Sequence, residues 1–232
     1  MTTLHAAPLF RKPIALVVFL ENVGHIAGLQ LPAWVMQVID YVTEEYAKLL
    51  LRLLGAYRRY DKVVILEDEQ ANGVALGEAL LATSRTHRVD VLLLAHGHIG
   101  QLVGFRNRTR VGKETFTPLC DAYCANEQLL DLRMVYGINC YGYSLADTWR
   151  TLGASVVNGA VGVNWFPEPS LSVFLYNWLR GRRYSEAVRR SNHAANRFWQ
   201  HIWKRKPDGT PHDFLLSSRM IVTGNEDVTI FS

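Results

Sequence analysis

The chain has 232 residues, of which 49% are hydrophobic and 20% are charged, with 25 Lys and Arg against 21 Asp and Glu. This composition is too apolar for a disordered protein, and a domain of this length can bury a core without disulfides or metal ions. The longest apolar run, residues 14–20, is far shorter than the roughly 20 residues that cross a bilayer, which excludes a membrane-spanning helix. No small-residue cleavage site follows that run, so a signal peptide is not predicted. We expect one cytoplasmic domain over residues 1–232, with no membrane partner.

Strands and helices alternate along the predicted chain. Residues 13–20 form a continuous apolar run rich in β-branched side chains, which is typical of a strand buried on both faces. Further strands are predicted at 62–66, 89–95, 132–138, 154–158 and 220–223, with a hairpin formed by 100–105 and 109–116. Apolar residues at helical spacing predict helices at 33–57, 73–84, 118–130, 144–152, 171–179 and 185–203. Ser144 is a candidate N-cap.

This alternation predicts an α/β fold, a three-layer sandwich with a mostly parallel central sheet. Crossover connections between parallel strands are right-handed and place helices on both faces of the sheet. Ligands and catalytic groups in such sheets gather at the carboxyl ends of the strands. The residues that follow each predicted strand are therefore the ones to search for chemistry.

Two of these strand ends carry reactive side chains. The strand at 89–95 is followed by His96-Gly97-His98, and the strand at 132–138 by Asn139-Cys140. If the two strands are neighbours, about 4.8 Å apart, the imidazole and the thiol emerge at the same edge. A histidine beside a thiol can take its proton, so that the sulfur attacks a carbonyl group. We predict His96 and Cys140 as a catalytic dyad, with His98 as the competitor for His96.

Backbone groups at the same strand ends suit this chemistry. Gly97 lets the backbone approach a substrate closely, and the N–H groups of Gly97 and Cys140 are candidates for an oxyanion hole. A helix that begins near Ser144 is expected to favour the thiolate form of Cys140 through the field at its N-terminus. Asn139 points to the opposite face of its strand, which favours a structural hydrogen bond.

At these residues the chain resembles the caspase-like (clan CD) cysteine peptidases, which include caspases, metacaspases, gingipains, separase and the CHAT-domain proteases. The stretches that carry the resemblance are Val91–Gly100, with its buried strand ending in His96-Gly97, and Met134–Gly142, which contains Cys140. Cys140 follows His96 by 44 positions, which is close to the roughly 50 of caspases. The CHAT type is nearest, because residues 153–157 and 184–190 continue its pattern. The resemblance covers roughly residues 62–203 and implies a protein or peptide substrate and no cofactor.

The chain departs from the family at the specificity-determining positions. Ile138-Asn139 precedes the cysteine where caspases have Gln-Ala, and the caspase pocket arginines have no match, so cleavage after Asp is not expected. Glu21 ends the first strand at an edge that shapes the pocket in this family. If it lines that pocket, it favours a basic residue before the cut. A solvated loop acid is the favoured interpretation of Glu21. Asn164 and Trp165, with Phe166, are candidates for another wall of that pocket. Packing in the core is the alternative interpretation.

The remaining cysteines and the basic residues have simpler interpretations. Cys120 and Cys124 lie four residues apart on a predicted helix without a matching ligand set, so buried thiols are preferred over a metal site. Residues 180–206 hold nine Lys and Arg against one acidic residue, Glu186, which leaves the rest of the chain net negative. An amphipathic surface helix explains this segment, and nucleic acid is the less favoured partner.

The residues therefore favour a cysteine endopeptidase that works through the His96–Cys140 dyad and an acyl-enzyme. An activating effector or partner protein is compatible with this function. The alternative is a non-catalytic module of the same fold, which binds a protein or nucleic-acid partner through its basic C-terminal helices. A third option is thiol-dependent acyl transfer or hydrolysis on a non-protein substrate.

Overall fold

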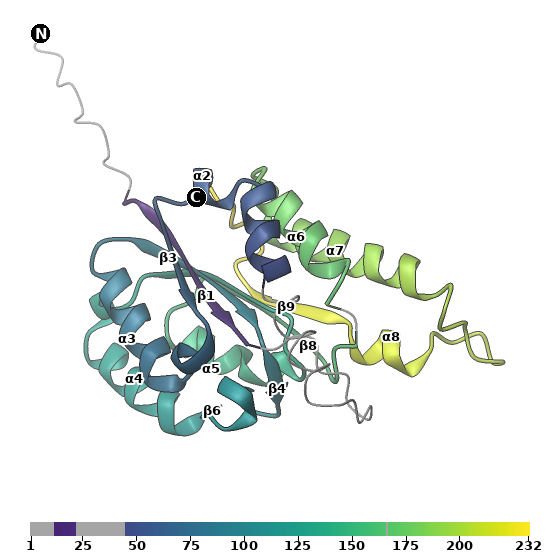
Figure 1. Cartoon of the computed structure of the whole chain (residues 1–232), viewed down its shortest axis with the longest axis horizontal. Coiled ribbons are helices and arrows are strands. Elements are labelled where there is room, and N and C mark those ends of the chain that lie inside the picture. The colour runs from purple at the N-terminus through teal and green to yellow at the C-terminus, as the bar shows by residue number, and fades with distance from the viewer. Residues whose placement is uncertain (1–11, 22–44, 166) are drawn as a thin grey trace, which may run out of the picture.

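The centre of the molecule is a six-stranded sheet in the order β2-β1-β3-β7-β8-β9, as a computed structural model shows (Figure 1). The structure describes residues 12–21, 45–165 and 167–232. The strands of this sheet are β1 (Ile14–Leu20), β2 (Lys62–Leu66), β3 (Arg88–Leu94), β7 (Leu132–Gly137), β8 (Val156–Ala160) and β9 (Met220–Gly224). All neighbouring pairs in it are parallel except β8 and β9, which are antiparallel. The predicted mostly parallel α/β sheet is confirmed.

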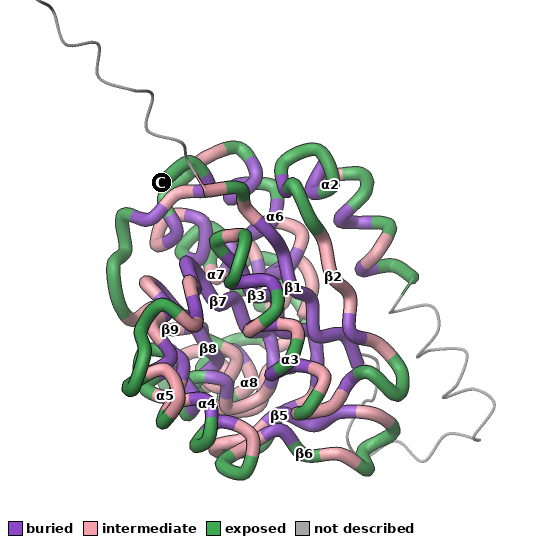
Figure 2. Tube along the Cα trace, turned by 90° about the vertical axis from the view of Figure 1, so that its left-hand side faces the viewer, coloured by how far each residue is buried: buried purple, intermediate pink, exposed green. Residues whose placement is uncertain are grey.

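Helices cover both faces of the sheet and explain why its inner strands are apolar throughout (Figures 1 and 2). One face packs against α3 (Gly73–Ser84), α4 (Lys113–Ala125) and α5 (Ala146–Thr151). The other packs against the helical residues 45–53, α2 (Ala56–Arg59), α6 (Ser170–Trp178) and α7 (Tyr184–Trp199). The sandwich therefore has two hydrophobic cores, one on each side of the sheet. No helix in the described ranges combines the length and apolarity needed to cross a bilayer.

A second, three-stranded antiparallel sheet follows the carboxyl end of β3. It consists of β4 (His96–His98), β5 (Gln101–Val103) and β6 (Arg110–Val111). Short elements complete the chain: the 3-10 helices η1 (Asp68–Gln70), η2 (Phe105–Asn107), η3 (Glu127–Leu129) and η4 (Gly142–Leu145), and the helix α8 (Asp213–Ser217). Because β4 begins at His96, this small sheet orients the backbone around the predicted catalytic histidine.

The predicted hairpin exists, but its strands are shorter than expected. β5 and β6 pair around the predicted turn, yet the second strand ends at Val111 and α4 begins at Lys113. Phe116 and Leu119 are buried three residues apart, which is the spacing of a helix face rather than of a strand. Pro118, expected near the start of this helix, lies inside it.

Other boundaries also differ from the prediction. Within the expected helix at 33–57, residues 33–44 lie outside the described ranges, and residues 45–53 are helical. The helix breaks at Gly55, whose φ of +83° suits glycine, and α2 follows. Ser144 is not an N-cap, because it lies inside η4 and α5 begins at Ala146. The helix α8 was not predicted.

A buried ion pair links β3 to β7. Asp90 and Arg133 are 0% and 2% exposed, and the guanidinium donates two hydrogen bonds of 2.8 Å to the two carboxylate oxygens. Asp90 also accepts a 2.6 Å hydrogen bond from the Tyr60 hydroxyl, which in turn accepts one of 2.9 Å from the Trp178 indole. Arg133 donates a further bond of 2.6 Å to the carbonyl of Ile230. The pair thus joins two strands, the residue after α2, helix α6 and the C-terminal segment.

A β-bulge makes this pairing geometrically possible. Val89 pairs with Leu132 and Asp90 with Met134, so Arg133 is an extra residue on β7. A bulge breaks the alternation of side chains, and here it turns Arg133 to the same side of the sheet as Asp90. The change of side is visible in the packing, because Leu132 and Met134 belong to different hydrophobic cores although they lie two residues apart.

Replacing Arg133 by Met tests the contribution of this pair. The Asp90 carboxylate would remain buried without its counter-ion, so we expect the free energy of unfolding to fall by about 3–5 kcal/mol. Urea denaturation followed by circular dichroism measures it. The matched control is Arg88→Met, which removes a bridge to Asp131 whose arginine is 44% exposed, and which should cost less than about 1 kcal/mol. Equal losses in the two variants would contradict the assignment.

Candidate active site

The predicted site residues follow the carboxyl ends of four adjacent strands. Glu21 follows β1, His96 follows β3, Cys140 follows β7, and Asn164 and Trp165 lie in the loop after β8. β3 and β7 are direct neighbours, and their pairing continues past the strand ends, because the N–H of Ile138 donates to the carbonyl of Leu93 at 3.1 Å. The histidine and cysteine segments therefore start from the same edge of the sheet, as predicted.

Gly97 brings the histidine segment into contact with the cysteine segment. Gly97 is buried, and a Cβ atom there would collide with the carbonyl oxygen of Cys140 and lie 2.9 Å from the side-chain nitrogen of Asn139. Glycine is therefore required by close backbone packing as well as by any substrate. His96 itself is half-buried, its Nε2 atom is shielded from solvent, and His98 is exposed. The structure brings His96-Gly97 and Cys140 together; their catalytic roles stay predictions.

The sulfur of Cys140 lies against backbone groups of the loop after β8. The N–H of Asn164 donates to Sγ at 3.3 Å, and the thiol lies 3.9 Å from the carbonyl of the same residue. Burial raises the pKa of the Cys140 thiol, while the backbone N–H groups of Asn164, Cys140 and Gly97 oppose that rise. The expected stabilisation of the thiolate is therefore not the dominant effect. The Cys140 thiol is therefore harder to ionise than a solvated cysteine.

A tight turn follows Cys140. Tyr141 has a φ of +54°, a left-handed conformation that costs energy for a residue other than glycine, and its N–H donates to the carbonyl of Gly162 at 2.7 Å. Ser144 secures the turn, because its hydroxyl donates to the carbonyl of Tyr141 at 2.6 Å and accepts the N–H of Gly100 at 2.8 Å. Ser144 thus ties the loop after β4 to the loop after Cys140, a role that sequence reasoning missed.

The side chain of Asn139 contacts the backbone of this turn. It is 1% exposed, and its side-chain nitrogen donates to the carbonyl of Cys140 at 3.4 Å. Its amide group also lies against Gly97 and Gly142, where a Cβ atom would approach it to 2.9 Å and 3.1 Å. This agrees with the structural hydrogen bond expected from the sequence. Asn139 fills the space between the histidine and cysteine segments, so that the two cannot shift independently.

Asn158 and Tyr184 support β7 just before the cysteine, and neither was predicted. Asn158 is 2% exposed, and its side chain bonds both backbone groups of Gly137 at 3.2–3.3 Å. The hydroxyl of Tyr184 lies 2.6 Å from the Asn158 oxygen and 2.7 Å from the carbonyl of Val135. A buried Asn in an otherwise apolar strand was the signal that could have identified this support.

Glu21 is buried rather than solvated. It is 5% exposed, its N–H donates to the carbonyl of Leu94 at 2.9 Å, and its carboxylate accepts the backbone N–H of Arg106 at 2.7 Å. Arg106 has a left-handed φ of +49° within η2. The carboxylate therefore fixes the loop between β5 and β6 against the edge of the main sheet. The favoured prediction of a solvated loop acid is therefore wrong.

The two predicted wall residues after β8 differ in position. Asn164 lies beside the thiol, and its side-chain nitrogen donates to the carbonyl of Ile138 at 2.6 Å. The ring of Trp165 stacks on Phe214 of α8 at a centroid distance of 4.4 Å, and its backbone N–H donates to the hydroxyl of Ser218 at 2.9 Å. The structure thus holds Asn164 at Cys140, whereas Trp165 anchors the loop by packing. The neighbouring residue 166 lies outside the described ranges.

No group of three or more His, Cys, Asp or Glu side chains that could hold a metal ion occurs among the described residues. Cys120 and Cys124 are free thiols on α4; Cys120 is half-buried and Cys124 is exposed.

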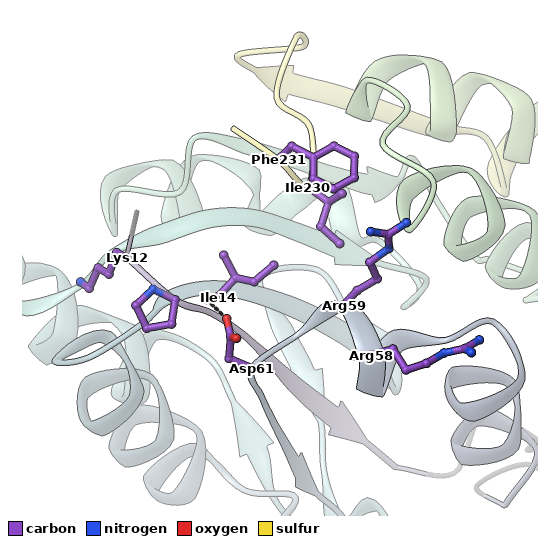
Figure 3. A pocket seen from close by; sticks show the side chains of 8 residues that line it. Lys12, Ile14, Arg58, Arg59, Asp61, Ile230 and Phe231 are labelled. Atoms are coloured by element: carbon purple, nitrogen blue, oxygen red, sulfur yellow. Dashed lines mark hydrogen bonds between the residues drawn. The ribbon is translucent and has the colours of Figure 1, made fainter. Parts of the chain in front are cut away.

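A pocket of about 340 Å³ lies at the opposite, amino edge of the sheet, where Asp61 accepts the N–H of Ile14 at 2.8 Å (Figure 3). Arg59 there extends over the ring of Phe231. This pocket shares no residue with the candidate active site.

No family model and no curated protein matches the sequence. The structure is similar to that of the Arg specific cysteine proteinase gingipain R, with a TM-score of 0.59 and 13% identity over 93% of this chain and 47% of that one. It is also similar to the complex of Porphyromonas gingivalis RgpB pro- and mature domains, with a TM-score of 0.55 and 11% identity over 94% and 48% of the two chains. The chain has a caspase-like α/β fold. It spans about half the length of these solved chains, and at this identity the likeness shows the fold.

The ionisation of Cys140 can be measured by alkylation. In a Cys120→Ser, Cys124→Ser background, the rate of iodoacetamide modification should rise with pH to a midpoint above that of the same chain unfolded in urea. The reason is that burial disfavours the reactive thiolate, which raises the pKa in the folded state. Mass spectrometry of the Cys140 peptide gives the rate. A folded-state midpoint below the unfolded one would show instead that the thiolate is stabilised at rest.

Proposed function

We propose that the chain is a cysteine endopeptidase that hydrolyses peptide bonds through His96 and Cys140. The observation that carries the proposal is the packing of Gly97 on Cys140 at the carboxyl edge of β3 and β7. The residue that follows His96 is thus in contact with Cys140, in a fold similar to that of a cysteine proteinase. We propose that the His96 imidazole reaches the thiol as its base, and this chemistry supplies the reaction type.

The proposed reaction has two steps. His96 takes the proton of the Cys140 thiol as the sulfur attacks the scissile carbonyl carbon, which forms a C–S bond and an oxyanion. The N–H groups of Gly97 and Cys140 stabilise the oxyanion, and His96 returns the proton to the leaving amine as the C–N bond breaks. Water, activated by the same histidine, then cleaves the thioester and regenerates the thiol. No cofactor takes part.

The raised pKa of the thiol supports general-base activation rather than a preformed ion pair. A buried, protonated thiol is a weak nucleophile until a base removes its proton. The N–H groups that oppose the pKa rise come from Asn164, Gly97 and Cys140, and they are of the kind that also stabilises an oxyanion. Asn164 is therefore proposed as a third backbone donor at the site, next to the two predicted from the sequence.

We propose that the enzyme prefers a basic residue before the cut. Glu21 supports this, because it lies at the edge where the site residues converge, and a carboxylate there pairs with a cationic side chain when it is ionised. Its bond to the Arg106 N–H gives the carboxylate a fixed position. Asn164 is proposed as a wall of the same pocket, and Trp165 as the support of that wall.

The finer assignments rest on the sequence pattern. Within the caspase-like peptidases we propose the CHAT type, from the residues after Cys140, and a cytoplasmic location. Protein or peptide substrates follow from the reaction, and an activating effector or partner protein is compatible with the resting contacts of the thiol. Non-catalytic binding through the basic helices is the alternative function, and it predicts a chain without hydrolytic activity.

Alanine variants of the dyad test the reaction. Cys140→Ala and His96→Ala should each lower the rate of cleavage of a fluorogenic peptide library by at least about a thousandfold, because nucleophile and base act as one unit. The matched controls are Cys124→Ala and His98→Ala, which should keep the activity. Circular dichroism verifies that each variant is folded. Full activity of Cys140→Ala, or an inactive wild-type chain, would overturn the assignment.

The proposed specificity is tested by Glu21→Gln. Removing the charge while keeping the shape should lower kcat/KM for substrates with Arg or Lys before the cut by about tenfold to hundredfold, relative to substrates with Gln there. Glu69→Gln, which changes an exposed acid in η1, is the control. Equal effects of Glu21→Gln on all substrates would indicate that Glu21 acts by holding η2 and not by contact with the substrate.

A further inference from the structure

The strand β9 lies at the open edge of the main sheet, beside α7 (Figure 1). On one side it pairs with β8 through alternate residues. Two hydrogen bonds establish which residues these are: the N–H of Val161 donates to the carbonyl of Arg219 at 3.1 Å, and the N–H of Asn225 donates to the carbonyl of Ser155 at 2.8 Å. In an antiparallel ladder the intervening residues direct their N–H and C=O groups away from the partner. Met220, Val222 and Gly224 therefore present their backbone groups to the outside of the sheet.

The first of these outward positions is already occupied by a side chain. Asn192 of α7 donates to the carbonyl of Met220 at 2.8 Å and accepts its N–H at 3.0 Å, so its amide pairs with the strand edge as a peptide group would. Within the described part of the chain, no hydrogen bond uses the outward groups of Val222 or Gly224. The edge is thus capped at one end and open along the rest of β9.

A groove of about 680 Å³ runs along this open edge, between α7 and β9. Its lining includes Met220, Ile221 and Val222 of the strand and Val188 and Asn192 of the helix. An extended peptide lies in such a groove by adding a strand to the sheet, with backbone hydrogen bonds for affinity and side-chain contacts for specificity. The backbone geometry therefore favours an extended ligand over a helical one.

The charges of the groove favour an acidic ligand. Arg183, Arg189 and Arg219 line it, and Arg189 and Arg219 form no ion pair among the described residues. Of the two acids in the lining, Glu186 is bonded to Arg190 at 2.8 Å, and that bond together with the charges of neighbouring arginines lowers its pKa. Glu226 lies beyond the end of the strand. Arg183 is paired with Asp227 at 3.1 Å, so the positive field of the groove comes from Arg189 and Arg219.

We propose that this groove binds an extended, acidic segment of a partner protein, which pairs with β9 at Val222 and Gly224. A second copy of the chain is a poorer occupant, because two-fold pairing of β9 with itself would bring the arginines of one groove against those of the other. The proposal concerns binding alone and does not depend on the peptidase function. It gives the basic residues of α7 that line the groove a role in binding a partner protein.

Fluorescence anisotropy with a labelled eight-residue peptide that alternates Glu and Val tests the proposal. The Cys140→Ala chain is used, so that cleavage cannot consume the peptide. We expect saturable binding, at least about tenfold weaker after Arg189→Glu with Arg219→Glu. The matched control is Arg197→Glu, which changes an exposed arginine of α7 outside the groove and should leave binding unchanged. A peptide that alternates Lys and Val should not bind.

Two further measurements separate strand pairing from charge attraction. Val222→Pro removes one outward N–H but none of the donors to β8, so it should weaken binding of the peptide. N-methylation of alternate peptide bonds in the probe should also weaken binding, because it removes the matching donors of the peptide. Binding that is insensitive to both changes would overturn the proposal in favour of simple charge attraction. Sedimentation equilibrium that shows a dimer abolished by Val222→Pro would overturn it in favour of a second copy.

Discussion

The buried pair between Asp90 and Arg133 is the constraint on which the rest of the structure depends. Removing two charges from water costs free energy, and here each charge has hydrogen-bond partners inside the protein. Asp90 and Arg133 form a bidentate contact, Asp90 also accepts from the Tyr60 hydroxyl, and Arg133 also donates to backbone carbonyls of the C-terminal segment. Such a pair is weak evidence for stability in itself, since well-packed apolar residues can replace it. Its effect here is on geometry. The pair lies at the bulge at Arg133, where the register between β3 and β7 shifts.

The positions of the candidate active-site residues depend on how β3 and β7 pair. β3 and β7 are the strands whose continuations carry His96 and Cys140, so their register decides where the imidazole and the thiol emerge. Past the strand ends, the fit is maintained by small contacts: Gly97 against the Cys140 carbonyl, Asn139 between the two segments, and Ser144 across the two loops. The site is therefore built mainly from backbone packing. Side chains larger than hydrogen at Gly97 would separate the two halves.

The environment of the thiol results from two opposed effects. Burial removes water from Cys140 and raises its pKa, whereas three backbone N–H groups stabilise the anion and oppose the rise. Burial has the larger effect, so the net shift of the pKa is upward. In the proposed reaction, the same N–H groups would stabilise the oxyanion. A site that is protonated at rest and lined by donors suits acyl transfer with general-base assistance.

The sequence by itself determined the class of fold and the two reactive strand ends. Apolar runs such as residues 14–20 and 132–137 are strands because a parallel sheet is covered on both faces, and residues after them must lie at its carboxyl edge. The tertiary structure decided what depends on contacts between distant residues. Arg133 faces Asp90 because of a bulge, Glu21 is buried because it meets the Arg106 N–H, and Ser144 joins two loops rather than capping a helix. The thiol is bound by the backbone of residue 164, and backbone groups leave no signature in the sequence. Local patterns fix what each segment can be, whereas the partners of a buried charge or backbone group are known only when the segments are packed.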